Sequence, residues 1–332
     1  MSPGSTSSFS PFYILFALIL LMVSGLGAAA TTTGSSVPVP TSGPIIGVLA
    51  EEITSESMQK FATSNTSSFI TASYIKWIES GGGRAVPITL NQPDSYYNNL
   101  ISKLNGLVFP GGAASLHLGG YAKAGKVLYG TAQTMNQQGN YFPIWGTCLG
   151  FELLSTFTAD RGNILGSCSA ENISLPVSFQ NGYKTSKMLA SASTDILSML
   201  AKEPITANNH KKCLAPTNFT ANGLNTKMNI LATSVSQDNV VFVAMVEDSR
   251  YPFYGVQFHS EKPQFESHHP SAGAFAAHAV QAGQYFANFL VSEAKKNKQR
   301  FANKEEEDKY SIHSYKPIPA RGTIYDEIYV FN

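Results

Sequence analysis

The 332-residue sequence is poor in charge, and its two signs are balanced. Charged residues make up 14% of the chain, against about 25% in a typical soluble protein. The 23 Lys and Arg face 22 Asp and Glu, which gives a formal net charge of +1. Proteins that bind nucleic acid through its phosphates carry a basic excess, so we expect no nucleic-acid partner. With 43% apolar residues, the chain as a whole is not disordered.

Cysteine is also scarce, with three residues at Cys148, Cys168 and Cys213. This number excludes a disulfide-rich scaffold, and because it is odd, at least one thiol has no partner within the chain. The sequence leaves open whether Cys168 pairs with Cys213. Metal-ligand spacings, a Walker loop and a G-x-G-x-x-G motif are absent too, so we expect no metal and no cofactor.

The first 50 residues contain no charged side chain, and residues 12–23 are an almost unbroken apolar run. Such a run followed by small residues is typical of a secretory signal peptide, and we expect cleavage after Ala30. The alternative is an uncleaved anchor, because residues 11–30 are about long enough to span a bilayer. The strongly apolar part is short for a span, so we expect no stable membrane anchor after cleavage. Residues 31–43 then form a flexible leader rich in Thr, Ser and Pro.

The sequence contains three Asn-x-Ser/Thr sequons, at Asn65, Asn172 and Asn218, which can be glycosylated only if the chain enters the secretory pathway. Each triplet is weak by itself, because short motifs arise by chance. Behind a signal peptide they predict N-glycosylation.

Residues 44–296 show no repeat and no linker, and their first half alternates strand-like with helical patterns. This alternation predicts βαβ units on a parallel sheet. Strands are predicted at 44–50, 85–90, 106–109, 141–145, 240–246 and 254–258, and helices at 69–80, 95–104, 121–138, 151–157, 194–201 and 273–296.

Residues 297–332 carry 12 charges in 36 positions. The charged run favours a solvated tail. Its last part, residues 323–331, is aromatic and β-prone, and favours a docked edge strand instead.

A G-x-C-x-G motif, formed by Gly146, Cys148 and Gly150, lies between a predicted strand and a predicted helix. This is the pattern of a nucleophile elbow, in which glycines permit a tight turn that exposes the nucleophile at the edge of the sheet. The helix N-terminus is expected to lower the pKa of the thiol. The alternative is an inert, buried cysteine in a glycine turn.

A Pro-Gly-Gly turn ends the predicted strand 106–109, and its glycines are Gly111 and Gly112. Their backbone N–H groups, together with that of Leu149, are expected to form an oxyanion hole beside Cys148. The alternative is an ordinary loop.

His259 and Glu261 follow the predicted strand 254–258 and are two residues apart, so their side chains share one face. A carboxylate next to an imidazole fixes its tautomer and stabilises the imidazolium, which can then activate a thiol.

These segments resemble the gamma-glutamyl hydrolase family (folate gamma-glutamyl hydrolase, peptidase family C26). The resemblance extends from about residue 44 to the C-terminus. It implies an α/β fold of class I glutamine amidotransferase-like (flavodoxin-like) type, a doubly wound, mostly parallel sheet flanked by helices. The catalytic domain would span 44–296, and a docked, charged extension, 297–332, would end in a strand. The matching stretches are 44–50 (PIIGVLA), 72–87 (ASYIKWIESGGGRAVP), 105–112 (NGLVFPGG), 141–152 (YFPIWGTCLGFE) and 251–266 (YPFYGVQFHSEKPQFE).

The resemblance implies that Cys148 is the nucleophile, His259 the proton donor and acceptor, and Glu261 the triad carboxylate with a secondary contribution. His210 matches a family histidine before the NFT sequon and would line the substrate cleft. Lys212 and Cys213 depart there from the aromatic residue and serine that are usual. Tyr74 is a further cleft candidate, although its predicted helix also suits a structural role.

The implied activity is that of a cysteine hydrolase that cleaves gamma-glutamyl bonds of folylpoly-gamma-glutamates through a thioester. A homodimer is implied, and the expected location is the secretory pathway, either outside the cell or in the lysosome or vacuole. Endo- versus exo-cleavage and the residues that bind the substrate's α-carboxylates stay open.

Three alternative functions are compatible with the same motifs. One is a glutaminase-type amidotransferase subunit, which requires a cytosolic synthetase partner and conflicts with the leader. Another is a secreted gamma-glutamyl peptidase for other substrates, such as glutathione conjugates. The third is a non-catalytic glycoprotein, against which the intact Cys148, His259 and Glu261 argue.

Overall fold

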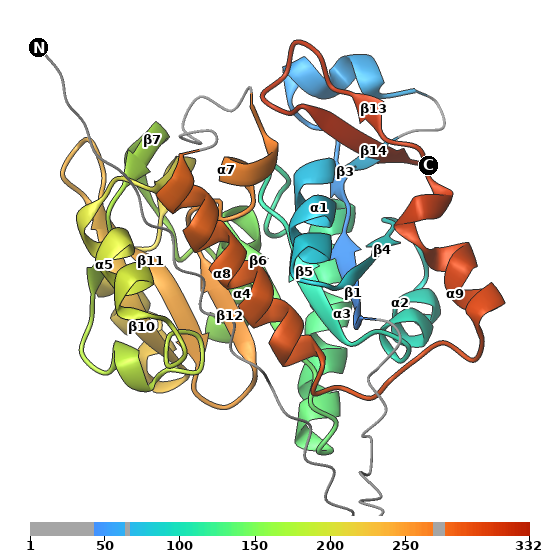
Figure 1. Ribbon diagram of the computed structural model, residues 1–332, viewed down its shortest axis with the longest axis horizontal. Helices are drawn as coiled ribbons and strands as arrows, with labels where there is room; N and C mark the ends of the chain where they lie inside the picture. Colours follow the sequence, from blue (N-terminus) through green and yellow to red (C-terminus); the bar gives the residue numbers. More distant parts are fainter. Residues whose placement is uncertain (1–42, 64–66, 268–275) are drawn as a thin grey trace, which may run out of the picture. The chain divides into compact units, whose positions relative to one another are not determined.

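A computed structural model of the chain describes residues 43–63, 67–267 and 276–332 (Figure 1). The predicted signal peptide, nearly all of the predicted leader and Asn65 lie outside the described residues. Within the described ranges, no helix has the length and apolarity that a bilayer span requires.

The centre of the fold is an eight-stranded sheet that combines a parallel half with an antiparallel half. The parallel strands are buried apolar runs, as expected when helices cover both faces of a sheet. In spatial order the parallel half comprises β4 (Arg84–Ile88), β1 (Ile45–Leu49), β5 (Gly106–Phe109), β6 (Ile144–Thr147) and β12 (Phe253–Val256), and the antiparallel half β11 (Val241–Asp248), β10 (Met228–Val235) and β8 (Ser178–Phe179).

Two groups of helices flank this sheet, which confirms the predicted doubly wound α/β class. In one group α1 (Ala72–Ser80) packs against α8 (Ala277–Ala294), and the indole N–H of Trp77 donates to the Gly283 carbonyl at 2.8 Å. In the other, α3 (Gly119–Gln137) packs against α2 (Asp94–Ile101) and α4 (Leu149–Ala159). The helices are α1 (Ala72–Ser80), α2 (Asp94–Ile101), α3 (Gly119–Gln137), α4 (Leu149–Ala159), α5 (Thr194–Lys202), α6 (Pro216–Ala221), α7 (Lys262–Phe265), α8 (Ala277–Ala294) and α9 (Lys304–Tyr310), with short 3₁₀ turns at Glu56–Phe61, Tyr183–Thr185, Leu224–Thr226 and Ile312–Ser314.

The helix predicted at 69–80 begins later than expected, because its first residues form strand β3 (Ser68–Thr71). The helical spacing of its apolar residues suggested one continuous element. Thr71 instead has extended backbone angles (φ −72°, ψ 135°). Phe69 pairs with a strand on each side, and Ile70 pairs with a strand on one side. Aromatic and β-branched residues suit such a ladder, so tertiary pairing outweighs the helical pattern here.

The C-terminal extension is folded, and the solvated-tail alternative is wrong. Strand β14 (Glu327–Phe331) pairs with β3, as predicted for a docked strand, but β13 (Ile318–Pro319) covers its other side, so it is not an edge strand. The second sheet therefore has the order β13-β14-β3-β2, with β2 at Glu51–Glu52 (Figure 1). Ion pairs of Glu307 with Arg84 and of Glu306 with Lys103 hold α9 against the main domain.

Two strands that the sequence did not predict, β7 (Gly166–Leu175) and β9 (Thr206–Cys213), form a separate antiparallel pair. A disulfide between Cys168 and Cys213 joins them, with a Cα–Cα distance of 5.9 Å. Its presence answers the pairing question left open by the sequence and leaves Cys148 as the free thiol.

We expect Ile328→Ala to destabilise the docked strand strongly. Ile328 is fully buried in a small cluster with Ile53, Met58, Phe69 and Ala320. Its truncation removes about 2 to 5 kcal/mol from the free energy of unfolding, measured in urea. The control is Val241→Ala, at a position with 46% exposure, for which the change stays near zero. Equal stability of the two variants would show that β14 contributes nothing.

Candidate active site

Cys148 occupies a strained turn between β6 and α4. Its backbone angles, φ 52° and ψ −111°, are disfavoured for a residue with a side chain. It is the N-cap residue of α4 and is 5% exposed. The turn therefore has the geometry of the predicted nucleophile elbow.

The two motif glycines allow the turn to pack against neighbouring backbone. A Cβ on Gly150 would lie 1.8 Å from the carbonyl oxygen of Phe109, the last residue of β5. A Cβ on Gly146 would lie 2.5 Å from the Gly150 carbonyl oxygen. Any side chain at these positions would displace the elbow from the end of β5.

The Pro-Gly-Gly turn brings the nucleophile and the imidazole together. A Cβ on Gly111 would lie 2.6 Å from His259 Cε1 and 2.9 Å from Cys148 Cβ, so both side chains converge on this glycine. The N–H of Gly111 donates to the Tyr74 hydroxyl at 2.7 Å. Burial, and after it the Glu261 carboxylate, raise the pKa of Tyr74 well above its usual value. Tyr74 is thus a neutral support beneath the turn and not a residue of the cleft wall.

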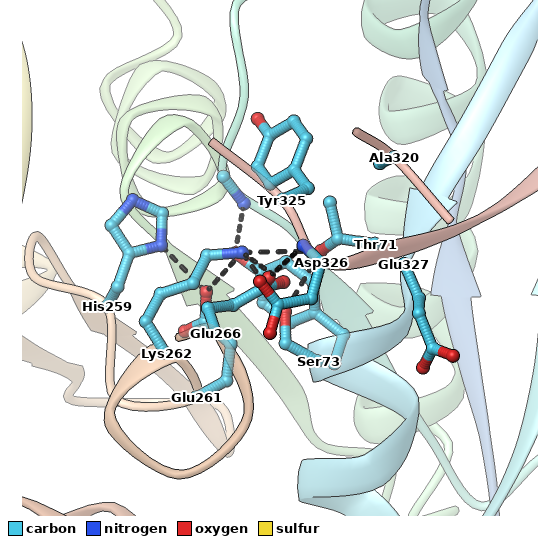
Figure 2. Close-up of polar contacts among 12 residues, drawn as sticks. Thr71, Ser73, His259, Glu261, Lys262, Glu266, Ala320, Tyr325, Asp326 and Glu327 are labelled. Carbon is cyan, nitrogen blue, oxygen red and sulfur yellow. Dashed lines mark hydrogen bonds and ion pairs between the residues drawn. The ribbon is translucent and has the colours of Figure 1, made fainter. Parts of the chain in front are cut away.

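His259 and Glu261 form the carboxylate–imidazole pair that the sequence predicts (Figure 2). His259 Nδ1 lies 2.7 Å from Glu261 Oε1, and the Glu261 side chain is fully buried. Burial alone would raise the pKa of Glu261, but His259 and Lys262 outweigh it and hold this pKa at about 2. The backbone N–H of His259 donates to Ala207 of β9 at 2.8 Å, which fixes the segment beyond β12.

The acidity of Cys148 differs from the sequence expectation. Burial, and after it Glu152 in the first turn of α4, raise the pKa of the Cys148 thiol well above its usual value, whereas the helix N-terminus was expected to lower it. Burial also raises the pKa of Glu152 to about 8, so this carboxyl is largely protonated at neutral pH. The resting thiol is therefore neutral and needs a base when substrate binds.

The predicted oxyanion-hole residues lie at the elbow and the facing turn. The N–H of Leu149 hydrogen-bonds to the Cys148 sulfur and lowers the pKa of the thiol. The N–H of Gly111 is engaged by Tyr74. The Leu149 N–H faces the sulfur itself, and Gly112 lines the cleft beside Cys148, so these two residues remain as candidate donors to an oxyanion formed at the sulfur.

A cleft of about 220 Å³ opens at Cys148, and its wall contains residues that the sequence analysis missed. Glu51, the first residue of β2 and two positions after the end of β1, accepts a hydrogen bond from Ala113 N–H at 3.0 Å. Burial raises the pKa of Glu51 to about 8. Its position after a parallel strand was the available signal, because such strand ends meet at one edge of the sheet. The lining residues are Glu51, Glu52, Thr54, Ser55, Ser57, Phe69, Gly112, Ala113, Cys148, Asn209, His259, Lys262, Ile324 and Tyr325.

A larger groove of about 980 Å³ lies along α3 and contains none of the catalytic candidates.

His210 faces the core and is not part of this wall, in which its neighbour Asn209 takes part. The His210 ring is 6% exposed and packs edge-on against Phe242, and burial lowers its pKa to about 4. Its Nδ1 lies 2.9 Å from the Lys212 carbonyl oxygen.

Among the described residues, one group of three potential metal ligands clusters within 4.8 Å: Cys168, His210 and Cys213. Both sulfurs belong to the disulfide, so they are not thiolate ligands.

The two sequons within the described residues differ in accessibility. Asn172 is exposed on β7. Asn218 is half-buried on α6, where its Nδ2 donates to the Ile164 carbonyl at 3.3 Å.

Comparisons with known proteins show the family to which the chain is similar. Residues 44–261 match the Peptidase C26 family. The chain is 36% identical to gamma-glutamyl hydrolase of Homo sapiens over 291 residues, which are 87% of this chain and 90% of the relative. It is 34% identical to gamma-glutamyl hydrolase B of Dictyostelium discoideum, with 87% and 83% covered, and 32% identical to gamma-glutamyl hydrolase 1 of Arabidopsis thaliana, with 87% and 82% covered. Among solved structures, the glutaminase domain of Trypanosoma brucei CTPS aligns with a TM-score of 0.47 at 12% identity, covering 77% of this chain and 95% of that one.

We expect Gly150→Ala to disrupt the elbow. The added methyl group would overlap the Phe109 carbonyl oxygen, so the free energy of unfolding falls by roughly 3 kcal/mol or more. Urea unfolding measures this change. Gly162→Ala is the control, because no atom lies within 4 Å of a Cβ there, and its effect stays within about 0.5 kcal/mol. A Gly150→Ala variant as stable as the control would contradict the close packing.

We expect Glu152→Gln to change how stability depends on pH. In the folded wild type the pKa of Glu152 is about 8, against 4.5 ordinarily. The contribution of the protonated carboxyl to the free energy of unfolding is therefore fully present below pH 4.5, and it is lost as pH rises towards 8 because the unfolded chain gives up its proton first. The amide variant keeps the oxygen that accepts from Gln257 but does not titrate. It should therefore gain about 1.4 kcal/mol per pH unit relative to wild type across this window, measured by urea unfolding.

The control for this experiment is Glu305→Gln, whose side chain is 82% exposed. Its stability should follow the wild type at every pH. A Glu152→Gln difference that stays flat with pH would show that Glu152 is ionised in the folded protein.

Proposed function

The chain belongs to the peptidase C26 family and is a hydrolase, and we propose that it cleaves the gamma-glutamyl bonds of folylpoly-gamma-glutamates through Cys148. The observation that carries the proposal is the convergence of Cys148 and His259 on Gly111, with Glu261 bound behind the imidazole. The relatives named gamma-glutamyl hydrolase cover most of this chain, which supports the choice of bond.

The reaction begins with the neutral thiol. His259 takes the Cys148 proton as the sulfur attacks the side-chain carbonyl of the gamma-linked glutamate. The N–H groups of Leu149 and Gly112 stabilise the oxyanion. The imidazolium then protonates the leaving amine, and a gamma-glutamyl thioester remains on Cys148. Water activated by His259 hydrolyses this thioester and regenerates the thiol.

Glu261 stabilises the imidazolium at both steps. Because its pKa is about 2, it stays ionised over the working range of pH and holds His259 in the tautomer with a proton on Nδ1. The Nε2 atom is then the one that exchanges protons with the thiol, the leaving amine and the water.

Glu51 shapes the charge of the cleft. Below about pH 8 its carboxyl is protonated, so it presents a neutral wall to an anionic substrate. This property favours turnover at neutral and acidic pH.

We further propose the setting in which this reaction takes place. The uncharged leader with its apolar run supports entry into the secretory pathway, with delivery outside the cell or to the lysosome or vacuole. The disulfide between Cys168 and Cys213 supports an oxidising compartment, and the exposed Asn172 suits N-glycosylation. The proposed partners are the small-molecule substrate and a second copy of the chain in a homodimer.

Cys148→Ala and His259→Ala should abolish hydrolysis of pteroylpentaglutamate. The first variant lacks the nucleophile and the second lacks the group that accepts the thiol proton, while circular dichroism should show an unchanged fold. The products are separated by chromatography after incubation at about pH 4.5 to 7. Release of ammonia from glutamine, or cleavage of glutathione conjugates in place of folate substrates, would favour the alternative activities.

His278→Ala is the matched control. His278 Nδ1 also lies 2.7 Å from a carboxylate, that of Glu203, but the pair is 40 to 45% exposed and lies outside the cleft. Its loss should leave turnover unchanged. Wild-type turnover by Cys148→Ala would refute the mechanism.

A further inference from the structure

A buried lysine stands directly behind the triad carboxylate. Lys262 is 1% exposed, and its Nζ lies 3.7 Å from Glu261 Oε1, the oxygen that also contacts His259. Burying an ammonium group is costly unless it is paired and hydrogen-bonded. The mechanism above does not use Lys262, so its burial requires another explanation.

The ammonium group of Lys262 is held from several elements at once (Figure 2). Oxygen atoms of α1, of β3 and of the end of α7 surround it, and two aromatic rings lie within cation–π distance. The contacts of Nζ are Ser73 Oγ at 3.0 Å, Glu266 Oε1 at 3.3 Å, Thr71 Oγ1 at 3.5 Å, the Tyr325 ring at 4.8 Å and the Tyr74 ring at 5.5 Å.

Glu266 and Tyr325 connect this lysine to the C-terminal segment 324–326. The second oxygen of Glu266, Oε2, accepts the backbone N–H of Asp326 at 2.6 Å. Ser267 donates to Asp326 Oδ2 through its N–H at 3.0 Å and its hydroxyl at 2.7 Å. Ile324 and Tyr325 line the cleft at Cys148. A wall of the active site therefore comes from a segment anchored at Lys262.

We propose that Lys262 is a positioning residue of the hydrolase, which holds the Glu261 carboxylate against His259 and anchors the 324–326 segment as a wall of the Cys148 cleft. The inference rests on the proposed function, because it assigns the lysine a role in that reaction. Lys262 does not touch the reacting atoms and acts through Glu261 and Tyr325.

The charges around Glu261 explain why an ammonium group is needed. His259 and Lys262 face it from its own segment, Tyr74 from α1, Cys148 from the elbow and Tyr325 from the C-terminal segment. Burial keeps both tyrosines and the resting thiol neutral. The His259 imidazole is cationic for only part of the cycle, and Lys262 supplies positive charge throughout it. Without Lys262 the pKa of Glu261 rises, and the carboxylate is lost at a higher pH.

The test is the double variant Lys262→Met/Glu266→Gln. It removes one buried cation and one buried anion, so the net charge of the cluster is unchanged, and the amide that replaces the Glu266 carboxylate retains an oxygen for the Asp326 N–H. We expect kcat for pteroylpentaglutamate to fall about tenfold with a smaller change in KM, since the lost interaction acts mainly in the transition state. The acid limb of log kcat/KM against pH should move to higher pH.

Lys76→Met is the matched control. Lys76 also pairs with a residue next to this segment, Glu327, but its side chain is 42% exposed. This variant should keep the wild-type kcat and the wild-type pH profile. If the double variant is folded, by near-UV circular dichroism, and also keeps both, the proposal is overturned.

A readout without substrate separates this proposal from the assigned activity. Cys148 is the free cysteine, so its alkylation by iodoacetamide as a function of pH reports on the triad alone. A shifted alkylation profile in the double variant, with no folate turnover by wild type, would refute the proposed substrate and retain the positioning role. An unshifted profile would refute the positioning role.

Tyr325→Leu provides a second route if the double variant does not fold. The leucine side chain keeps an apolar wall but removes the ring that faces the ammonium group. We expect a raised KM and the same direction of shift in the alkylation profile. Wild-type values for both would overturn the proposal.

Discussion

The rest of the active site depends on one buried charge, the carboxylate of Glu261. A carboxylate removed from water is unstable unless cations and donors surround it. His259 meets this need on one side and Lys262 on the other, and they share the same oxygen. Lys262, being buried as well, needs partners of its own, which come from α1, β3, α7 and the C-terminal segment. Charge compensation of the single Glu261 carboxylate thus involves four separate parts of the fold.

Backbone geometry imposes a second constraint on the same few residues. Parallel strands β5, β6 and β12 end at one edge of the sheet, so the Gly-Gly turn, the elbow and the His-x-Glu segment meet there. The strained backbone of Cys148 is tolerated because Gly150 rests directly on Phe109 and Gly111 leaves room for both reacting side chains. Tyr74 supports the turn from below through the Gly111 N–H. The packing of the two turns thus fixes the position of the Cys148 thiol. The buried charges of Glu261 and Lys262 lie behind the imidazole that we propose as its proton acceptor.

Short local motifs in the sequence were enough to predict the elbow and the carboxylate–imidazole pair. The parts of the cleft that come from segments far apart in the chain were not predicted. The elbow at Cys148 and the pair at His259 are short motifs at strand ends, so spacing alone located them. The wall residues Glu51 and Tyr325 reach the cleft only through tertiary packing, which no local pattern records. The error at 69–80 has the same origin, because Phe69 satisfies a helical period while its backbone pairs with a strand about 260 residues later. The pair β7–β9 was missed because its polar, irregular residues lack a clear alternation.

The pairing of β3 with β14 has a consequence for biosynthesis. The ribosome makes β3 early, and its partner follows roughly 260 residues later, so for most of translation this edge is unpaired. Once β12 has been made, the strands that flank the Cys148 elbow are all present, yet the wall formed by Tyr325 and its contact with Lys262 are still missing. A growing chain is therefore an incomplete catalyst. The order of synthesis itself delays activity until the segment that completes the cleft has been made and has docked.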